Sequence, residues 1–213
     1  MDAFVFDAYG TLFDVHSVVR RCEALWPGKG AALSQAWRTK QLEYTWQRSL
    51  MGRYRPFSEV TRDALQWACE SLGLALREED LAQLMADYLE LDLFPEVAQA
   101  LGRLRGRKTA ILSNGSPDML EPLVRHSGLA LDAVISVDSL RIYKPAPAVY
   151  ELAMKTLGVA DKTAITFVSS NGWDAIGAKA FGFRVFWVNR SGAPLDRMDV
   201  APDRIGRTLL ELG

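Results

Sequence analysis

The feature of this chain that most constrains its fold is a regular alternation of short apolar segments with amphipathic segments after residue 94. Four apolar segments rich in β-branched and aromatic residues follow one another there, at 109–112, 133–135, 165–168 and 185–188. The stretches between them are long enough for a helix, so the pattern predicts βαβ units and a parallel sheet. Residues 3–6 form another such segment and predict one more strand.

A block without strand signals separates the strand at 3–6 from the others. From about residue 15 to 92, apolar side chains recur at helical spacing, as in Val15, Val18, Val19 and Cys22. Within this block, Ser58 is a candidate N-cap for one helix and Gly73 predicts where that helix ends. The block is therefore expected to be an all-helical unit inserted into a sheet domain.

Length and composition indicate an ordinary globular protein. The chain has 213 residues, 49% apolar and 24% charged, with a formal net charge of -1. It can bury a substantial core, and the charge balance favours neither a nucleic-acid partner nor a membrane partner. Cys22 and Cys69 lie in helical patterns and are predicted to be reduced core residues. The cysteines, together with an amino terminus unlike a signal peptide, favour a cytoplasmic protein.

Polar clusters follow three of the predicted strands, at the point where each strand ends. Asp7 follows the strand at 3–6, Ser113 and Asn114 follow 109–112, and the segment 169–174 follows 165–168. Loop formation is the more common role for any one such cluster. The carboxyl ends of parallel strands, however, face one crevice in which ligands bind. Three clusters at equivalent positions therefore favour a ligand site.

Lys144 lies in the proline-bounded segment Lys144-Pro145-Ala146-Pro147. Pro147 predicts the start of a helix with Tyr150 in its first turn. A lysine in front of a helix is most often a solvated surface charge. A stiff loop near the polar clusters would instead hold its cation in place. The residues alone leave both interpretations open.

Four segments of the chain resemble the sequence motifs of the haloacid dehalogenase superfamily. They are Asp7-Ala8-Tyr9-Gly10-Thr11, Leu112-Ser113-Asn114-Gly115, Lys144-Pro145-Ala146-Pro147 and Phe167-Val168-Ser169-Ser170-Asn171-Gly172-Trp173-Asp174. More narrowly, these segments and residues 37–46 resemble the L-2-haloacid dehalogenases, with similarity over nearly the full chain.

That resemblance implies an α/β fold with a Rossmann-like parallel core of five to six strands and an inserted helical cap. The core domain would comprise residues 1–13 and 93–213, and the cap domain residues 14–92. The resemblance also implies a homodimer with a small-molecule 2-haloacid substrate and no cofactor.

Two departures from the superfamily's phosphatases point to dehalogenation. A phosphatase needs a second aspartate two residues after its nucleophile as an acid, and this position holds Tyr9. The fourth motif has Ser169, Ser170 and Asn171 where a further acidic magnesium ligand would be expected. We therefore expect no metal. A halide leaves as a stable anion and needs neither a proton nor a metal.

The hypothesis for the reaction begins with attack by the Asp7 carboxylate on the halogen-bearing carbon. Lys144 would keep Asp7 ionised, while Thr11 and Ser169 would hold it through hydrogen bonds. Asp174, helped by Asn171, would then activate the water that hydrolyses the ester. The substrate carboxylate would be bound by the polar groups nearest the first two strands, which are Ser113 and the backbone N–H groups of Ala8 and Tyr9.

The resemblance assigns the halide to Arg38, Asn114 and Trp173, and the apolar lining to Leu42, Phe57 and Trp173. Arg38 heads a helical stripe that continues through Leu42, and an arginine in such a place is more often a surface residue. A second face of this helix, with Trp37 and Tyr44, predicts a buried contact that is either internal or between subunits. Tyr150 is expected to support Lys144 or the substrate.

The expected reaction is hydrolysis of short (S)-2-haloalkanoic acids to (R)-2-hydroxy acids and halide, through an ester on Asp7 and with inversion. Two alternatives stay open. One is a phosphatase of the same fold acting on a small phosphate ester. The other is a non-catalytic protein that binds small carboxylates. Residue types do not set the pocket volume, so the preferred halogen and chain length stay open as well.

Overall fold

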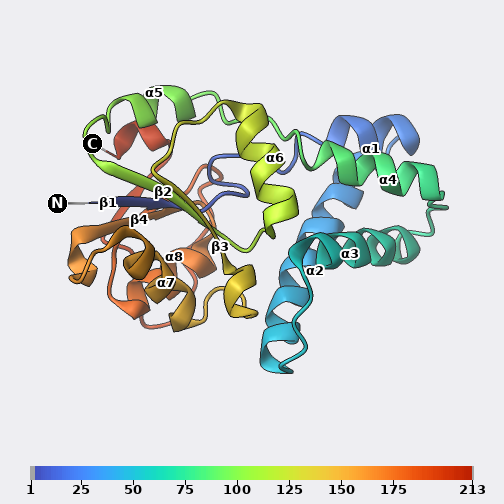
Figure 1. Cartoon of the computed structure of the whole chain (residues 1–213). Helices are drawn as coiled ribbons and strands as arrows, with labels where there is room; N and C mark the ends of the chain where they lie inside the picture. The colour runs from blue at the N-terminus through green and yellow to red at the C-terminus, as the bar shows by residue number, and fades with distance from the viewer. Residues whose placement is uncertain (1–2, 213) are drawn as a thin grey trace.

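A six-stranded parallel sheet forms the centre of one half of the molecule in the computed structural model, which describes residues 3–212 (Figure 1). Its strand order is β3-β2-β1-β4-β5-β6, and every neighbouring pair is parallel. The strands are β1 (Ala3–Phe6), β2 (Lys108–Ser113), β3 (Ala133–Ser136), β4 (Ile165–Ser169), β5 (Arg184–Val188) and β6 (Arg204–Gly206). All five predicted strands are confirmed. The sequence pattern did not predict β6, because this short strand has only one apolar side chain, that of Ile205.

Helices cover both faces of this sheet. Figure 1 shows α5 (Val97–Gly102) and α6 (Pro117–Ser127) above it, and α7 (Pro147–Leu157) and α8 (Gly172–Phe181) below it. Short 3-10 helices complete this half: η1 (Val137–Leu140), η2 (Lys162–Ala164) and η3 (Leu209–Glu211). The predicted start of α7 at Pro147 is confirmed. The four central strands, β2, β1, β4 and β5, are mostly buried on both faces, as expected for a parallel sheet.

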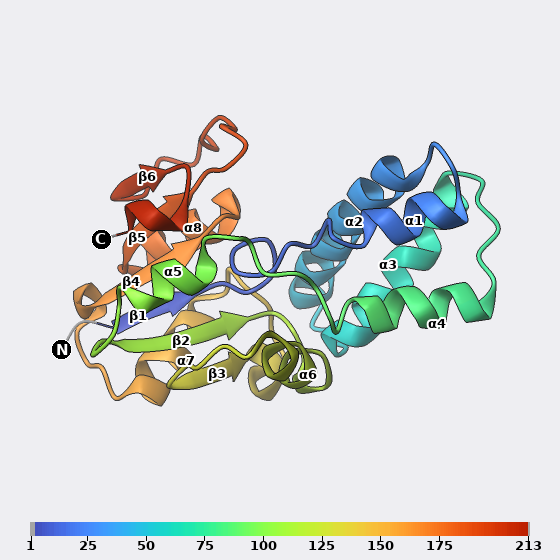
Figure 2. The same cartoon turned by 90° about the horizontal axis from the view of Figure 1, so that it is seen from above.

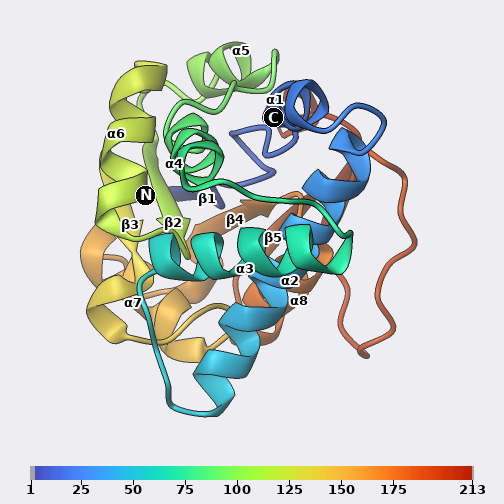
Figure 3. The same cartoon turned by 90° about the vertical axis from the view of Figure 1, so that its right-hand side faces the viewer.

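The helical block, as we name helices α1 to α4, lies to one side of the sheet in Figure 2, and α3 crosses α2 in Figure 3. Its helices are α1 (Val19–Leu25), α2 (Gly30–Leu50), α3 (Phe57–Ser71) and α4 (Glu78–Asp87). No helix within residues 3–212 is long and apolar enough to span a membrane.

The start of α3 differs from its prediction. The helix begins at Phe57, directly after Pro56, so Ser58 lies in the first turn and is not the N-cap. Its backbone N–H donates a hydrogen bond of 3.2 Å to Ser116 Oγ in the sheet half. Proline has a fixed φ that suits the position before a helix, and this took precedence over the capping tendency of serine. Gly73 follows the end of α3 with a φ of 65°, as predicted.

The second apolar face of α2 packs inside the chain. Trp37 is 1% exposed, its Nε1 donates to the Thr61 carbonyl oxygen at 2.8 Å, and its ring lies 5.0 Å from that of Tyr88. The Trp37 contact is therefore internal packing and not a subunit interface. Cys22 and Cys69 are buried free thiols in the same block, as predicted.

Two neighbouring segments connect the helical block to the sheet half. Phe13 and Leu93 form an antiparallel bridge. On either side of it, the Asp14 N–H donates to the Asp92 carbonyl at 2.8 Å, and the Phe94 N–H donates to the Leu12 carbonyl at 3.0 Å. The outgoing and returning connections thus form one short paired ribbon directly beside the loop that follows β1.

Candidate active site

Three charged side chains from distant parts of the sequence meet at the carboxyl edge of the sheet. Asp7 follows β1, Lys144 precedes α7, and Asp174 lies in the first turn of α8. Lys144 Nζ is 3.0 Å from Asp7 Oδ1 and 2.9 Å from Asp174 Oδ2. Asp7 is 6% exposed, Lys144 is 1% exposed and Asp174 is 0% exposed. The structure therefore supports the buried-cation interpretation of Lys144 over that of a surface charge.

Burial and charge pairing act in opposite directions on this network. Burial alone would lower the pKa of Lys144, but the carboxylates of Asp174 and Asp7 reverse this and raise it above its ordinary value. For Asp174, burial raises the pKa, Lys144 lowers it and Asp7 raises it again, which leaves the pKa at about 6. At neutral pH, Lys144 is a cation and Asp174 is mostly ionised.

The second oxygen of Asp7 faces a set of hydrogen-bond donors. Asp7 Oδ2 accepts hydrogen bonds from Thr11 Oγ1 at 3.0 Å, from Asn171 Nδ2 at 2.7 Å and from Ser169 Oγ at 3.5 Å. Ser169 Oγ also lies 3.3 Å from Asp174 Oδ2. Donors on both oxygens restrict the rotation of the Asp7 carboxylate.

The residues beside Asp7 do not fit a magnesium ion. Asn171 Nδ2 donates both to Asp7 Oδ2, at 2.7 Å, and to the Tyr9 carbonyl oxygen, at 3.1 Å. Magnesium needs oxygen ligands in near-octahedral arrangement. Here an amide NH₂ group already uses the two oxygens that would face such an ion, and the Lys144 ammonium occupies the other oxygen of Asp7.

Several polar groups near Asp7 keep free hydrogen-bonding capacity. Within residues 3–212, the backbone N–H groups of Ala8 and Tyr9 have no hydrogen-bond partner. Ser113 Oγ accepts from the Gly115 N–H at 3.0 Å, so its own hydroxyl proton can still be donated. Asn114 Oδ1 accepts from the Lys144 N–H at 3.0 Å and thereby fixes the lysine loop.

Arg38 reaches from α2 of the helical block to the loop after β1. Its Nη2 is 3.3 Å from the Tyr9 carbonyl oxygen and 3.5 Å from Asn171 Oδ1. Its Nη1 donates to Gln41 Oε1 at 2.7 Å. The guanidinium is only partly exposed. Arg38 is thus directed into the site, in contrast to the surface role that its position in the helix pattern favoured.

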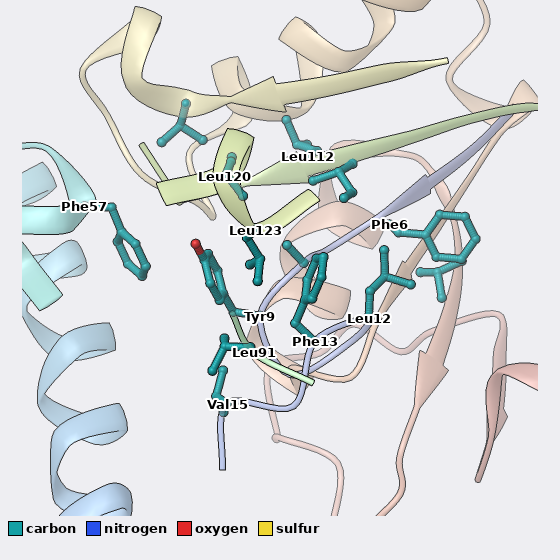
Figure 4. Packing of buried hydrophobic residues seen from close by; sticks show 14 of the residues in the cluster. Phe6, Tyr9, Leu12, Phe13, Val15, Phe57, Leu91, Leu112, Leu120 and Leu123 are labelled. Carbon is teal, nitrogen blue, oxygen red and sulfur yellow. The ribbon is translucent and has the colours of Figure 1, made fainter. Parts of the chain in front are cut away.

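An apolar wall closes the side of the site that faces the helical block. Figure 4 shows Phe57 of α3 directed toward Tyr9, and their ring centroids are 5.5 Å apart. The ring of Trp173 meets that of Trp46 edge-on at 5.4 Å. Leu42 is partly buried on α2, one turn after Arg38. Within residues 3–212, the Tyr9 hydroxyl and the indole N–H groups of Trp46 and Trp173 are buried without a partner.

Tyr150 lies behind Asp174. It is 0% exposed, and its hydroxyl donates to Asp174 Oδ1 at 2.8 Å. The expected role of Tyr150 is to support Lys144 or the substrate, and its hydroxyl reaches Lys144 through the Asp174 carboxylate. A glycine in α8 permits this approach, because a Cβ added to Gly177 would lie 2.6 Å from the Tyr150 hydroxyl oxygen.

Three further residues hold the site and were not predicted. Ser170 donates from its N–H to Thr11 Oγ1 at 2.8 Å, and Arg190 donates to the carbonyl oxygens of Gly10 and Thr11. Both follow strand ends, so the rule that led to Asp7 could have found them. Gln41, which is 0% exposed, orients Arg38. Its position on the apolar face of α2 carried no signal of that role.

Comparisons with known proteins agree with this geometry. Residues 1–182 match the family model described as haloacid dehalogenase-like hydrolase. The chain is 52% identical over 202 residues to the (S)-2-haloacid dehalogenase of Pseudomonas sp. (strain YL), covering 93% of this chain and 87% of that protein.

Solved structures of similar proteins have the same fold. A crystal structure of the L-2-haloacid dehalogenase RSc1362 matches with a TM-score of 0.97 and 50% identity, covering 100% of this chain and 96% of that one. The L-2-haloacid dehalogenase from Xanthobacter autotrophicus with chloropropionic acid covalently bound matches with a TM-score of 0.92 and 45% identity, over 100% and 96% of the two chains. The chain therefore belongs to the haloacid dehalogenase-like hydrolase family.

Proposed function

We propose that this protein hydrolyses short (S)-2-haloalkanoic acids to (R)-2-hydroxy acids and halide. The observation that carries the proposal is the buried arrangement of Lys144 Nζ between Asp7 and Asp174, with an asparagine amide on the remaining oxygen of Asp7. It provides an oriented carboxylate that is paired with a lysine. The relatives named as (S)-2-haloacid dehalogenases, and the one with covalently bound chloropropionic acid, support the same reaction.

In the first half-reaction, an oxygen of Asp7 attacks the halogen-bearing carbon from the side opposite the halogen. A carbon–oxygen bond forms while the carbon–halogen bond breaks, and the halide leaves with the bonding electrons. The carbon is inverted and Asp7 becomes an ester. Arg38, Asn114 and Trp173 receive the halide; the positive charge of Arg38 and the unpaired indole N–H of Trp173 suit an anion.

The substrate carboxylate would be held by the free N–H groups of Ala8 and Tyr9 and by the Ser113 hydroxyl. Leu42, Phe57 and Trp173 would line the space for the alkyl group. Because these groups bind a carboxylate next to the reacting carbon, the site would favour 2-halo acids over plain alkyl halides.

In the second half-reaction, water attacks the carbonyl carbon of the Asp7 ester and gives a proton to Asp174. The tetrahedral intermediate then expels the 2-hydroxy acid as its alkoxide, which takes the proton from Asp174. Asp7 is regenerated and its carboxyl proton goes to solvent with the halide. Asn171 would position the water, and Tyr150 would fix the orientation of Asp174.

We also propose that residues 14–92 act as a cap domain on a core of residues 1–13 and 93–213, and that the protein is a cytoplasmic homodimer. The paired ribbon at Phe13 and Leu93 supports the division into core and cap.

An exposed apolar surface supports the dimer. Leu50 and Met51, which are 89% and 63% exposed, offer an apolar contact at the end of α2. Sedimentation at neutral pH should give twice the 23.7 kDa chain mass. A monomer that stays monomeric at high concentration would exclude the dimer.

A halide-release assay on both enantiomers of 2-chloropropionate tests the proposed function. The (S) enantiomer should give chloride and (R)-lactate, and the (R) enantiomer should give neither. Replacing Asp7 by alanine removes the attacking oxygen and should lower turnover by at least about a thousandfold. Magnesium-dependent release of phosphate from a small ester, without chloride release, would instead favour a phosphatase.

Asp174→Ala should separate the two half-reactions. Alkylation needs no base, so the variant should still form the Asp7 ester, while hydrolysis should slow by about a hundredfold or more. Intact-mass spectrometry after one turnover would detect the trapped adduct, and Asp7→Ala is the control that cannot form it. Direct entry of oxygen from heavy-oxygen water into the product of a single turnover would contradict nucleophilic attack by Asp7.

The pH profile of ester hydrolysis should follow Asp174. Its pKa is raised to about 6, mainly by burial, and the base must be ionised, so activity is lost as pH falls through about 6. Below that pH, the rate of hydrolysis should fall roughly tenfold per unit. The Tyr150 hydrogen bond lowers the pKa of Asp174, so in Tyr150→Phe the fall in rate should begin at a higher pH. If rapid-quench measurements show the fall at the same pH in both proteins, the ionisation belongs to another group.

A further inference from the structure

We infer that Arg190 is a positioning residue for the loop that carries Asp7, an inference that rests on the proposed function. Arg190 lies two residues beyond the end of β5. Its Nη1 donates to the Gly10 carbonyl oxygen at 3.1 Å and its Nη2 donates to the Thr11 carbonyl oxygen at 2.9 Å. The guanidinium therefore holds two successive peptide groups only a few residues after Asp7.

The other side of this guanidinium is fixed as well. Nε and Nη2 of Arg190 are 3.1 Å and 2.8 Å from Glu96 Oε1, and its Cζ lies 3.7 Å above the centre of the Phe94 ring. The side chains of Arg190 and Glu96 are 22% and 15% exposed. A planar group with several donors can make all of these contacts at once, and a lysine ammonium cannot.

Holding Gly10 and Thr11 fixes the donor that orients the nucleophile. Gly10 has a φ of 85°, so the loop turns sharply at this residue. Directly after it, Thr11 Oγ1 donates to Asp7 Oδ2 at 3.0 Å. If the two carbonyl groups lost their donors, the loop could relax and carry the Thr11 hydroxyl away from Asp7.

A displacement of this kind acts on rate more than on binding. A shift of about 1 Å in a reacting group can cost roughly a hundredfold in rate. Within residues 3–212, the hydrogen bonds of Arg190 go to Gly10, Thr11 and Glu96, and none goes to the groups assigned to the substrate carboxylate or the halide. Loss of Arg190 should therefore lower kcat and leave KM nearly unchanged.

The experiment compares the wild type with Arg190→Ala, Arg190→Lys and Glu96→Gln in the turnover of (S)-2-chloropropionate. Arg20→Ala is the matched control, because Arg20 forms an exposed ion pair with Asp92 and lies outside the site. We expect Arg190→Ala to lower kcat by about ten- to a hundredfold with KM within about threefold. Arg190→Lys should recover only part of this loss, and Arg20→Ala should match the wild type.

Rapid-quench mass spectrometry separates positioning from a role in stability alone. The amplitude of the Asp7 ester burst counts active molecules, and its rate reports the alkylation step. A positioning role predicts a full amplitude with a slower rate in Arg190→Ala, and partial recovery of the rate on adding guanidinium at concentrations far below those that unfold the protein. A wild-type rate with a reduced amplitude would overturn the inference.

Two further results keep this inference distinct from the proposed function. If Arg190→Ala does not fold, Glu96→Gln carries the test, since it keeps the guanidinium but loosens its orientation; an unchanged burst rate there would overturn the inference. If the wild type releases no halide, the proposed function fails and the inference fails with it. If the wild type is active and Arg190→Ala alkylates at the wild-type rate, only the inference fails.

Discussion

Two carboxylates that contact the same buried side chain repel each other, and a cation between them offsets that repulsion. In this protein the cation is Lys144, whose ammonium lies within 3.0 Å of an oxygen of Asp7 and of Asp174. Removing a buried partner from such a network leaves an uncompensated charge, which is far more costly than losing a surface ion pair. The surroundings of Lys144 accordingly hold its loop in place, through the Asn114 side chain on its backbone N–H.

The topology of the sheet brings these charges together. Strand β1 lies at the point where the strand order reverses, between β2 and β4, so the loops after β1 and β4 open on one crevice. Asp7 follows one strand and Asn171 and Asp174 follow the other. A family that shares this scaffold can change its chemistry at these loops. Here the Asn171 amide donates to Asp7 and to the Tyr9 carbonyl oxygen, so neither of these oxygens faces an open position beside it.

The sequence predicted the parts of this arrangement that depend on local pattern. Strand ends marked Asp7 and the segment 169–174, and Pro147 marked the start of α7. The error at Ser58 arose because Pro56, and not the serine, set the helix start. The contact of Tyr150 with Asp174 depends on the space at Gly177, which the sequence pattern does not reveal.

Gln41 and Arg190 illustrate a more general limit. Both act by hydrogen bonds to groups brought near them only by the fold: Gln41 accepts from Arg38, and Arg190 donates to backbone carbonyl oxygens. Backbone carbonyl groups are present at every residue, so the strand-end rule could have singled out Arg190 as a candidate but not its bonds to Gly10 and Thr11. The resemblance to known dehalogenases pointed to Arg38 as a site residue, whereas helix periodicity alone would have assigned it to the surface.

The three buried charges at the sheet edge and several of the side chains that cover them come from different halves of the molecule. Asp7, Lys144 and Asp174 all belong to the sheet half, whereas Arg38 and Phe57 belong to the helical block. With Asp7 only 6% exposed, entry of a small acid requires side chains or the helical block to move. A swing of the block about the paired ribbon would withdraw Arg38 and leave the three charges as they are. The attacking group would thus be ready before substrate arrives, and each closure would add Arg38 to the groups that receive the halide and Phe57 to the apolar lining.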